Sequence, residues 1–513
     1  MIQGRKIEDG SPYLTDESKL SGHADYIYMP EDENDVIDIL AYANNRKTPI
    51  TISAMRTGVC GGAVPQGGDI LSMEKFDRIR GIGKDDRGYY IRLQPNVTVN
   101  ALNDIIRRKT YVNLTELTTG AISSMRGEST EFFYPVDPTE LNGSIGGNIS
   151  TNASGPRTFK YGPTRNWVRR IRVVLSNGHV LDISRGEIRA INGVIHIPDP
   201  NGVITICVPT YDFKKGIKNA TGLMSGSDMD LIDLFIGSEG ILGVITEADV
   251  YLAPWHPLIS NILFFSDYES AYGFVKGLNA SVVRPEFIEF FDGGSLNLIR
   301  RSRLSDSRFT GMPDIPDYAG SAVFFDLPYD DIIPMYDVIR DLAEIYGGSL
   351  DRSWCGHEIP DRKRFFSFRY SVPQSIFDYI GGLKTTIPGM HKRGTDMSVP
   401  LDNLDAMMDN YRTILSAANL EYVIFGHIGN GHLHVEILLK CLEDIDTARK
   451  AYRELAIKAI ELDGLPSAEH GIGKIKNEYI GLMYGNEGVV EIKGIKDALD
   501  PNWILCPGNM VTK

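Results

Sequence analysis

The stretch DPTELNGSIGGNISTNASG, residues 137–155, carries the strongest structural signal in this 513-residue chain. Ser144 and the Gly146-Gly147 pair stand where a helix is predicted to start, and the amide groups of a helix N-terminus suit a pyrophosphate. Two further glycine-rich segments lie at 55–65, after a predicted strand, and at 237–243. Each segment taken alone is compatible with a structural turn. Together they predict three separate loops that converge on one extended ligand.

The chain lacks the motifs of the common nucleotide-binding folds. It has no GxxxxGK[ST], and no GxGxxG between a strand and a helix with an acidic residue about 20 positions later, which argues against P-loop and Rossmann proteins. The composition, 42% hydrophobic and 23% charged residues, is that of a globular protein. A net charge of −14 argues against a nucleic-acid-binding protein. Any anionic substrate would need a local cationic pocket.

The cysteines indicate the compartment and exclude several cofactors. None of the five belongs to a CxxC pair, so neither a thioredoxin-like site nor an iron–sulfur cluster is expected on this chain. Their scatter favours a reduced, intracellular protein. The N-terminus has no apolar signal core, and no window holds 18 consecutive apolar residues. We therefore expect a cytoplasmic protein without a transmembrane segment. Peripheral membrane docking and a homodimer remain open.

Alternating hydrophobic periods divide the chain into α+β units. Residues 170–183 predict a β-hairpin, because two apolar strand patterns flank a Ser-Asn-Gly turn. A further strand at 243–252 is followed by Pro254 and Pro257, which places the main boundary near residue 255. Beyond it, strand and helix patterns alternate as in a unit with an antiparallel sheet. We expect three parts: residues 1–255, residues 256–455, and a C-terminal segment, 456–513, that completes the active site and packs back on the first part.

A second chemical site is predicted from the histidines, four of which gather in two short segments. The segment FGHIGNGHLHVE, residues 425–436, predicts a strand, a tight turn and a second strand. Strand alternation places His432, His434 and Glu436 on one face, and His427 ends the preceding strand.

The segment SAEHGIG, residues 467–473, adds Glu469 and His470 side by side in a glycine-flanked loop. Two imidazoles and one carboxylate with an open position form the donor set of a catalytic divalent-metal centre. The alternative is a group of hydrogen-bonded core histidines near a hairpin.

These motifs, in this order, resemble one family. The segments PVDP, GGNISTNASG and KYG within residues 135–162, and LFIGSEGILGVIT at 234–246, look like the FAD-binding domain of the vanillyl-alcohol-oxidase, or PCMH, type. Within it, the chain is similar to the branch of D-lactate dehydrogenase, D-2-hydroxyglutarate dehydrogenase and the glycolate oxidase flavoprotein subunit. The resemblance runs from about residue 25 to residue 508. It implies an α+β fold: a two-part FAD-binding domain, then an α+β cap domain with an antiparallel sheet.

The resemblance implies a dissociable FAD, because relatives with covalent FAD carry a histidine in the first glycine loop and this loop has none. This chain has Ala54-Met55-Arg56 where relatives often have three glycines, so either Arg56 contacts phosphate or the loop is shifted. The implied FAD-binding residues are Arg56, Thr57, Gly58, Gly61, Gly62, Pro135, Asp137, Ser144, Gly146, Gly147, Asn152, Gly155, Gly237, Glu239, Gly240, Gly243 and Ile245.

For the second site, the resemblance makes His427, His434 and Glu469 the ligands of zinc or a similar divalent ion, with His470 as the base. His432 stands where the family usually has asparagine. Three roles stay open for it: an extra ligand, a residue that tunes substrate choice, or a side chain that points away.

We place His432 among the substrate-binding residues, with Arg369 and Lys392 as cations for the substrate carboxylate. Asn430 replaces the usual aspartate of the motif, which removes a negative charge and leaves the metal identity open.

The expected activity is FAD-dependent oxidation of a D-2-hydroxy acid of the lactate, glycolate or 2-hydroxyglutarate class to the 2-oxo acid. The hydride passes to flavin N5 while His470 removes the hydroxyl proton. The electrons leave to an acceptor protein or quinone, such as an electron-transferring flavoprotein or an iron–sulfur subunit. Two alternatives remain: a non-redox FAD enzyme of the alkyl-glycerone-phosphate synthase type, and a flavin-free metallohydrolase.

Overall fold

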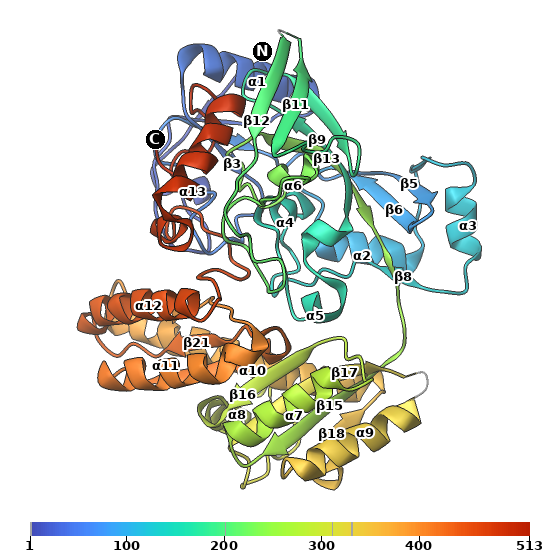
Figure 1. Ribbon diagram of the computed structural model, residues 1–513, viewed down its shortest axis with the longest axis vertical. Coiled ribbons are helices and arrows are strands. Elements are labelled where there is room, and N and C mark those ends of the chain that lie inside the picture. Colours follow the sequence, from blue (N-terminus) through green and yellow to red (C-terminus); the bar gives the residue numbers. More distant parts are fainter. Residues whose placement is uncertain (1–2, 201, 310, 330–331) are drawn as a thin grey trace.

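The computed structural model of the protein describes residues 3–200, 202–309, 311–329 and 332–513. The chain forms two lobes (Figure 1). The first lobe contains residues 3–257 and the C-terminal residues 478–513, and the second lobe contains 258–461. The predicted α+β class, with an antiparallel sheet in the second unit, is confirmed. The part boundaries at 255 and 455 stay predictions.

The first lobe is built on two sheets. The smaller has the strand order β1-β2-β4-β3, and the larger has the order β10-β9-β13-β6-β5-β7, antiparallel except for the pair β5–β7. The strands of this lobe are β1 (Arg5–Lys6), β2 (Tyr26–Tyr28), β3 (Ile50–Ser53), β4 (Asp69–Ser72), β5 (Ile79–Asp85), β6 (Gly88–Leu93), β7 (Thr115–Glu116), β8 (Phe132–Phe133), β9 (Val168–Val174), β10 (Val180–Ser184), β11 (Val194–Asp199), β12 (Gly202–Cys207), β13 (Val244–Tyr251) and β14 (Ala253–Pro254). The hairpin predicted for 170–183 is β9 and β10, with Gly178 at a φ of 85° in its turn.

The helices of the first lobe are mostly short. They are α1 (Glu33–Arg46), α2 (Val99–Arg108), α3 (Ala121–Gly127), α4 (Ile145–Thr151), α5 (Thr158–Tyr161), α6 (Ile232–Phe235) and α13 (Glu478–Leu499). Helix α1 begins with a capping box in which the Asp32 side chain accepts the Asp35 N–H and the Asp35 side chain reaches back.

The second lobe is built on one seven-stranded antiparallel sheet, with the order β18-β15-β17-β16-β20-β21-β19. Its strands are β15 (Leu258–Phe265), β16 (Ile288–Asp292), β17 (Ser321–Pro328), β18 (Trp354–Gly356), β19 (Arg393–Gly394), β20 (Tyr422–Gly426) and β21 (His434–Ile437), and its helices are α7 (Tyr268–Ala280), α8 (Gly293–Ser305), α9 (Ile332–Ile345), α10 (Ile359–Thr386), α11 (Leu404–Ala417) and α12 (Glu443–Glu461).

Helices cover both faces of this sheet, and β15 shows why. All eight of its residues are buried. Leu263 and Phe265 pack into one core with α7, while Ile262 and Phe264 pack into another with α8 and α10. Because successive strand residues point to opposite faces, a strand covered on both faces needs apolar side chains at adjacent positions, as at 262–265.

The C-terminal segment links the two lobes. Apolar residues of α12 belong to a core of the second lobe, whereas most of those of α13 belong to the core of the first, and Tyr479 near the start of α13 packs into the second-lobe core. The loop between these helices, residues 462–477, therefore carries Glu469 and His470 across the junction. Further along the chain, the Ile50 N–H of β3 donates to the Ile504 carbonyl, and the Cys506 N–H donates to the Ile50 carbonyl.

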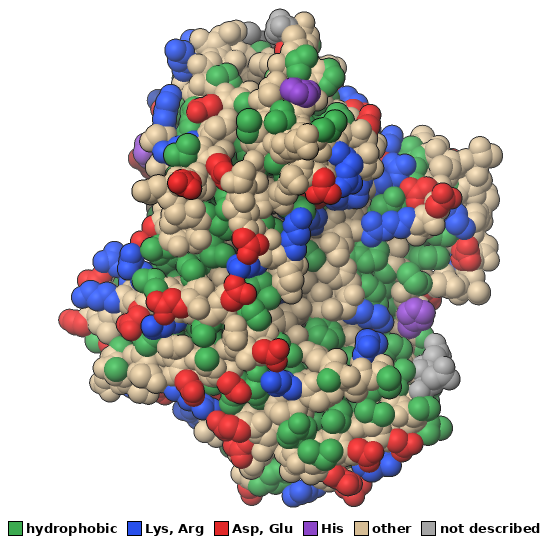
Figure 2. All heavy atoms as spheres, in the orientation of Figure 1, with side chains coloured by type: hydrophobic (Ala, Val, Ile, Leu, Met, Phe, Trp, Pro, Cys, Tyr) green, Lys and Arg blue, Asp and Glu red, His purple; other side chains and the backbone are tan. Residues whose placement is uncertain are grey.

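The charged side chains of the larger first-lobe sheet are paired across its strands. Arg92 lies 2.7 Å from Asp249 on the neighbouring strand, and Arg172 lies 2.8 Å from Asp182 on the strand next to its own. On the face shown in Figure 2, acidic and basic side chains are interspersed. In the described part of the chain, no helix combines the length and the apolar character that crossing a membrane requires.

Candidate active site between the two lobes

A cavity of about 1030 Å³, solvent at its mouth included, lies where the three glycine-rich segments meet. The C-terminal segment closes it, with His470, Gly473, Cys506 and Asn509 in its wall. The predicted cofactor-binding residues that line it are Arg56, Thr57, Gly58, Gly62, Ser144, Gly146, Gly147, Glu239, Gly240, Gly243 and Ile245. Those outside its lining are Gly61, Pro135, Asp137, Asn152, Gly155 and Gly237.

Two members of this second group support the loops instead. A Cβ on Gly155 would lie 2.0 Å from the Asp137 carbonyl oxygen, so glycine is needed there for packing. The Asp137 carboxylate accepts the Arg157 N–H at 3.0 Å, and burial raises its pKa to about 6.

The first turn of α4 differs from what its sequence indicated. Its leading N–H groups are already bonded within the protein: Ile145 to the Val97 carbonyl at 2.8 Å and Gly146 to the Pro95 carbonyl at 2.7 Å. The Gly147 N–H donates to the side chain of the N-cap residue, Ser144. The first glycine loop is different, because within the described chain the N–H groups of 57, 58 and 62 have no hydrogen-bond acceptor.

Arg56 occupies an unusual position in that loop. Its φ is 56°, a left-handed conformation for which glycine is the usual residue. The backbone of this loop thus has the left-handed conformation that glycine favours, at a position where relatives often have glycine. The guanidinium lies 3.0 Å from Glu74 Oε1 and 4.6 Å above the ring of Tyr13. These contacts hold the Arg56 side chain against the protein.

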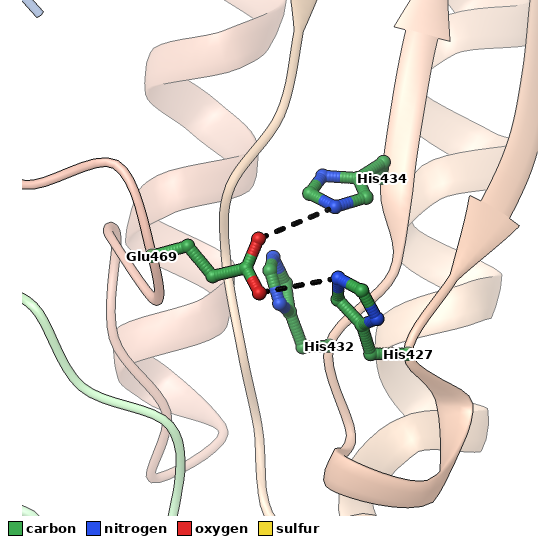
Figure 3. A group of neighbouring side chains, drawn as sticks. All are labelled: His427, His432, His434 and Glu469. Carbon is green, nitrogen blue, oxygen red and sulfur yellow. Dashed lines mark ion pairs between the residues drawn. The ribbon is translucent and has the colours of Figure 1, made fainter. Parts of the chain in front are cut away.

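The second predicted site is a buried cluster of His427, His432, His434 and Glu469, whose potential ligand atoms all lie within 4.8 Å of one another (Figure 3). Glu469 Oε1 lies 3.1 Å from His427 Nε2, and Oε2 lies 3.7 Å from His434 Nε2. His427 follows β20, a one-turn 3₁₀ helix follows it, and His434 begins β21.

His432 lies within this cluster, although we predicted it to bind substrate. It is 0% exposed, and neither ring nitrogen makes a hydrogen bond to the residues that the structure describes, although Nε2 lies 3.3 Å from Asp396 Oδ1. Burial lowers its pKa to about 4, against the opposing effect of Asp396. Glu436, expected on the same face, is not among the residues of the cluster in the described chain, and its Oε1 lies 2.6 Å from Lys392 Nζ.

Two groups that the sequence did not identify hold the cluster. Lys218, 1% exposed, donates from Nζ to Glu469 Oε1. Burial alone would raise the pKa of Glu469, but His427 and Lys218 hold it well below its usual value. Glu289 on β16 accepts a hydrogen bond from His427 Nδ1. The segment around Lys218 resembles an ordinary basic loop, and Glu289 is 138 residues from His427, so neither gave a local signal.

The predicted cations have protein partners. Arg369 is buried and donates from Nε to Glu289 Oε2 at 2.9 Å. Lys392 is half exposed beside Glu436. Both side chains thus border the second-lobe part of the site, Arg369 through the same carboxylate that holds His427.

His470 lies between the cavity and the cluster. It lines the cavity, and its ring stacks on that of His434 with centroids 5.8 Å apart. Its Nδ1 lies 3.4 Å from the buried carboxylate of Asp396, which also accepts a bond from Lys476 at 2.8 Å. Burial lowers the pKa of His470, with Asp396 acting in the opposite direction. This arrangement favours a neutral imidazole, which can accept a proton.

Comparisons with known proteins agree with this organisation. Residues 24–128 and 127–184 match the FAD binding domain family, and residues 386–510 match the family of FAD-linked oxidases, C-terminal domain. The chain is 27% identical to the glycolate oxidase subunit GlcD of Bacillus subtilis, covering 95% of this chain and 89% of that protein. It is 24% identical to a D-lactate dehydrogenase of Anaerostipes hadrus, covering 99% and 94%.

A D-2-hydroxyglutarate dehydrogenase of Xanthomonas citri is 25% identical, covering 94% of this chain and 88% of that protein. Among solved structures, alkyldihydroxyacetonephosphate synthase superposes with a TM-score of 0.62 over 95% of this chain and 77% of that chain, at 14% identity. That likeness shows the fold. The chain is therefore an FAD-binding oxidase of the PCMH type with an FAD-linked oxidase C-terminal domain, and glycolate oxidase subunits, D-lactate dehydrogenases and D-2-hydroxyglutarate dehydrogenases are its distant homologues.

Proposed function

We propose that this protein oxidises a D-2-hydroxy acid of the lactate, glycolate or 2-hydroxyglutarate class to the 2-oxo acid, with a non-covalent FAD, a divalent metal and His470 as the base. The position of His470 carries this proposal. It lines the cavity of an FAD-binding domain and stacks on a histidine of the His/Glu cluster. A substrate held at the cluster would therefore place its hydroxyl near the base and its C2 toward the cavity.

The residues of the cavity fit FAD. A Cβ on Gly58 would meet no protein atom within 4 Å, so protein packing does not require glycine there, and close approach of a ligand explains it. The N–H groups of 57 and 62 in the same loop have no acceptor among the described residues, which suits an anion such as a pyrophosphate. When bound, FAD supplies the hydride acceptor for C2 of the substrate.

The cluster fits a divalent metal. Three imidazoles and one carboxylate are typical donors for zinc and related ions, and the buried His432 ring makes no hydrogen bond in the described part of the chain. His427, His434 and Glu469 are the proposed ligands. When bound, the ion polarises the 2-hydroxyl group and lowers its pKa.

The chain's own residues would complete the reaction. His470 Nδ1 faces Asp396, which leaves Nε2 to take the hydroxyl proton. The Nε of Arg369 donates to Glu289, so the two terminal nitrogens of its guanidinium would bind the substrate carboxylate. Lys392, which is half exposed, would add a second positive charge at the solvent side of the site. Re-oxidation of the flavin would need an electron-acceptor protein or a quinone.

Anaerobic mixing of the FAD-loaded enzyme with D-lactate, glycolate and D-2-hydroxyglutarate tests this function, with L-lactate and L-2-hydroxyglutarate as controls. At least one of the three acids should bleach the flavin absorbance. His470→Gln should retain FAD but bleach at least 100-fold more slowly, in line with the usual contribution of a general base. His256→Gln, at an exposed position, should behave like the wild type.

Bleaching by His470→Gln at the wild-type rate would exclude His470 as the base. An FAD-loaded enzyme that no 2-hydroxy acid bleaches would instead favour a non-redox reaction of the alkyl-glycerone-phosphate synthase type. A colourless protein that takes up no added FAD would favour a metallohydrolase built on the cluster.

A further inference from the structure

We propose that His432 is a third imidazole ligand, so that the metal centre has three nitrogen donors and one carboxylate and prefers zinc, cobalt or copper to magnesium or manganese. The proposal rests on the metal part of the proposed function and goes beyond it. The sequence left the role of His432 open. The metal ligands of the proposed function are His427, His434 and Glu469, so His432 is not one of them.

The burial of His432 is the first observation. The residue is 0% exposed, and both ring nitrogens lack a hydrogen bond within the described chain. A buried polar group without a partner is rare in folded proteins because it has lost its bonds to water. A metal ion is one partner that a neutral imidazole nitrogen accepts.

The outer partners of the rings are the second observation. Metal-bound histidines almost always direct their other nitrogen to a carboxylate or a backbone carbonyl. His427 directs Nδ1 to Glu289, and His434 has Nδ1 3.3 Å from the Thr395 carbonyl. His432 has Nε2 3.3 Å from Asp396. Each ring therefore has one nitrogen near an outer acceptor and one left for the ion.

The spacing of the rings is the third observation. The centroids of His427 and His432 lie 5.2 Å apart, those of His427 and His434 lie 5.2 Å apart, and those of His432 and His434 lie 4.6 Å apart. The three rings thus surround one point, and Glu469 reaches the same place (Figure 3).

This donor set determines which ions bind well. An imidazole nitrogen in place of an amide oxygen makes the site softer, and nitrogen-rich sites favour zinc, copper, nickel and cobalt over magnesium, calcium and manganese. His432→Asn restores the residue that the motif usually has, so it is the matched variant for the test.

The test uses FAD-loaded enzyme that a chelator has stripped of metal. Cu²⁺ serves as the spectroscopic probe, and ¹⁵N-labelled histidine identifies imidazole nitrogens in its electron paramagnetic resonance spectrum. We expect three coordinated imidazoles in the wild type and two in His432→Asn. Competition with a chromophoric chelator should show Zn²⁺ bound at least tenfold more weakly by His432→Asn, with a smaller change for Mn²⁺. His196→Asn, on the exposed face of β11, should match the wild type in both measurements.

Two coordinated imidazoles in the wild type would overturn the proposal, and this measurement needs no variant to fold. Unchanged Zn²⁺ affinity in His432→Asn, or a wild-type enzyme that takes up neither Cu²⁺ nor Zn²⁺, would overturn it as well. Flavin content and anaerobic bleaching are measured separately. A failure of the oxidation proposal is therefore distinguishable from a failure of the third ligand.

Discussion

At the residue scale, the proposed chemistry depends on which side chains hold protons near neutral pH. His470 is the only histidine described that both lines the cavity and contacts the cluster. Burial favours its neutral form, and the Asp396 carboxylate opposes this only in part. A base that is neutral in the resting enzyme can accept the substrate proton without first losing its own.

The pH dependence of kcat/KM should therefore have an acid limb below the ordinary histidine pKa of about 6.5. The sign follows from the direction of the shift: the pKa of His470 is lowered, so the active neutral form persists as the pH falls and is lost only at lower pH. Steady-state rates with an artificial dye acceptor between pH 4.5 and 8.5 measure the midpoint. A midpoint above 6.5 would contradict a neutral resting His470.

Lys218 gives a second residue-scale prediction. The buried ammonium group of Lys218 forms an ion pair with Glu469, so this lysine competes with any cation that the Glu469 carboxylate would bind. Lys218→Met keeps much of the side-chain volume and removes the charge. We expect Zn²⁺ to bind about tenfold more tightly, equivalent to about 1.4 kcal/mol, in a chelator competition assay. Lys215→Met removes a lysine from the same segment and should leave the affinity unchanged. Weaker Zn²⁺ binding by Lys218→Met would show that the lysine supports the site instead.

The sequence identified the donors of the site but not their partners. The His-rich and Glu-His segments are contiguous motifs, so their residues could be found from the sequence alone. Lys218 meets Glu469 across 251 positions, and Asp396 meets His470 across 74. Such pairs arise only when the two lobes fold together, and no local pattern predicts them.

At the element scale, Glu239 joins the third glycine loop to the C-terminal segment. Its carboxylate accepts the N–H groups of Ile472 and Gly473, each at 2.6 Å, and its backbone has a φ of 52°. The side chain is buried in the cavity wall. Glu239 thus holds the loop that carries His470 against the cavity wall, while Asp396 accepts the N–H groups of Glu469 and His470.

Glu239→Ala should lower stability and flavin content together. Two buried N–H groups would lose their acceptor, which costs about 3 kcal/mol in the free energy of unfolding. Urea unfolding and the ratio of flavin to protein absorbance measure the two effects. Glu421→Ala removes an exposed partner of Lys440 and should cost less than about 1 kcal/mol. Glu239→Ala with wild-type stability would show that other contacts hold this loop.

Element boundaries were predictable where local signals are strong. The hairpin of β9 and β10 followed from its Asn-Gly turn, and its observed ends lie within two residues of those expected. The prediction for the second strand of the histidine hairpin was less accurate. We expected this strand to include His432, but β21 begins at His434. Gly431 adopts a left-handed φ of 64°, and His432 forms an isolated bridge with Ser398 instead of continuing the strand. His432 therefore belongs to the cluster from a position outside the regular strand.

At the scale of the whole molecule, the active site exists only when both lobes and the C-terminal segment meet. The first lobe supplies the cavity, the second supplies three histidines, and residues 462–477 supply Glu469 and His470. Lys160 and Tyr161 of the first lobe bind Glu286 of the second, at 2.5 Å and 3.1 Å, so a buried carboxylate holds the lobes at their junction. Chemistry at this junction is therefore sensitive to contacts far from the reacting atoms.

Removal of residues 504–513 should consequently abolish FAD retention, although it deletes none of the three glycine loops. Residues 504 and 506 bond to Ile50 of β3, and Asn509 lines the cavity and donates to the Glu239 carbonyl at 3.0 Å. Flavin content and thermal unfolding of the purified protein measure the effect. Removal of 512–513 alone, both exposed, is the control and should change neither. If the longer deletion kept its flavin, the loops of the first lobe would hold FAD without the C-terminal segment, and the site would assemble in two independent steps.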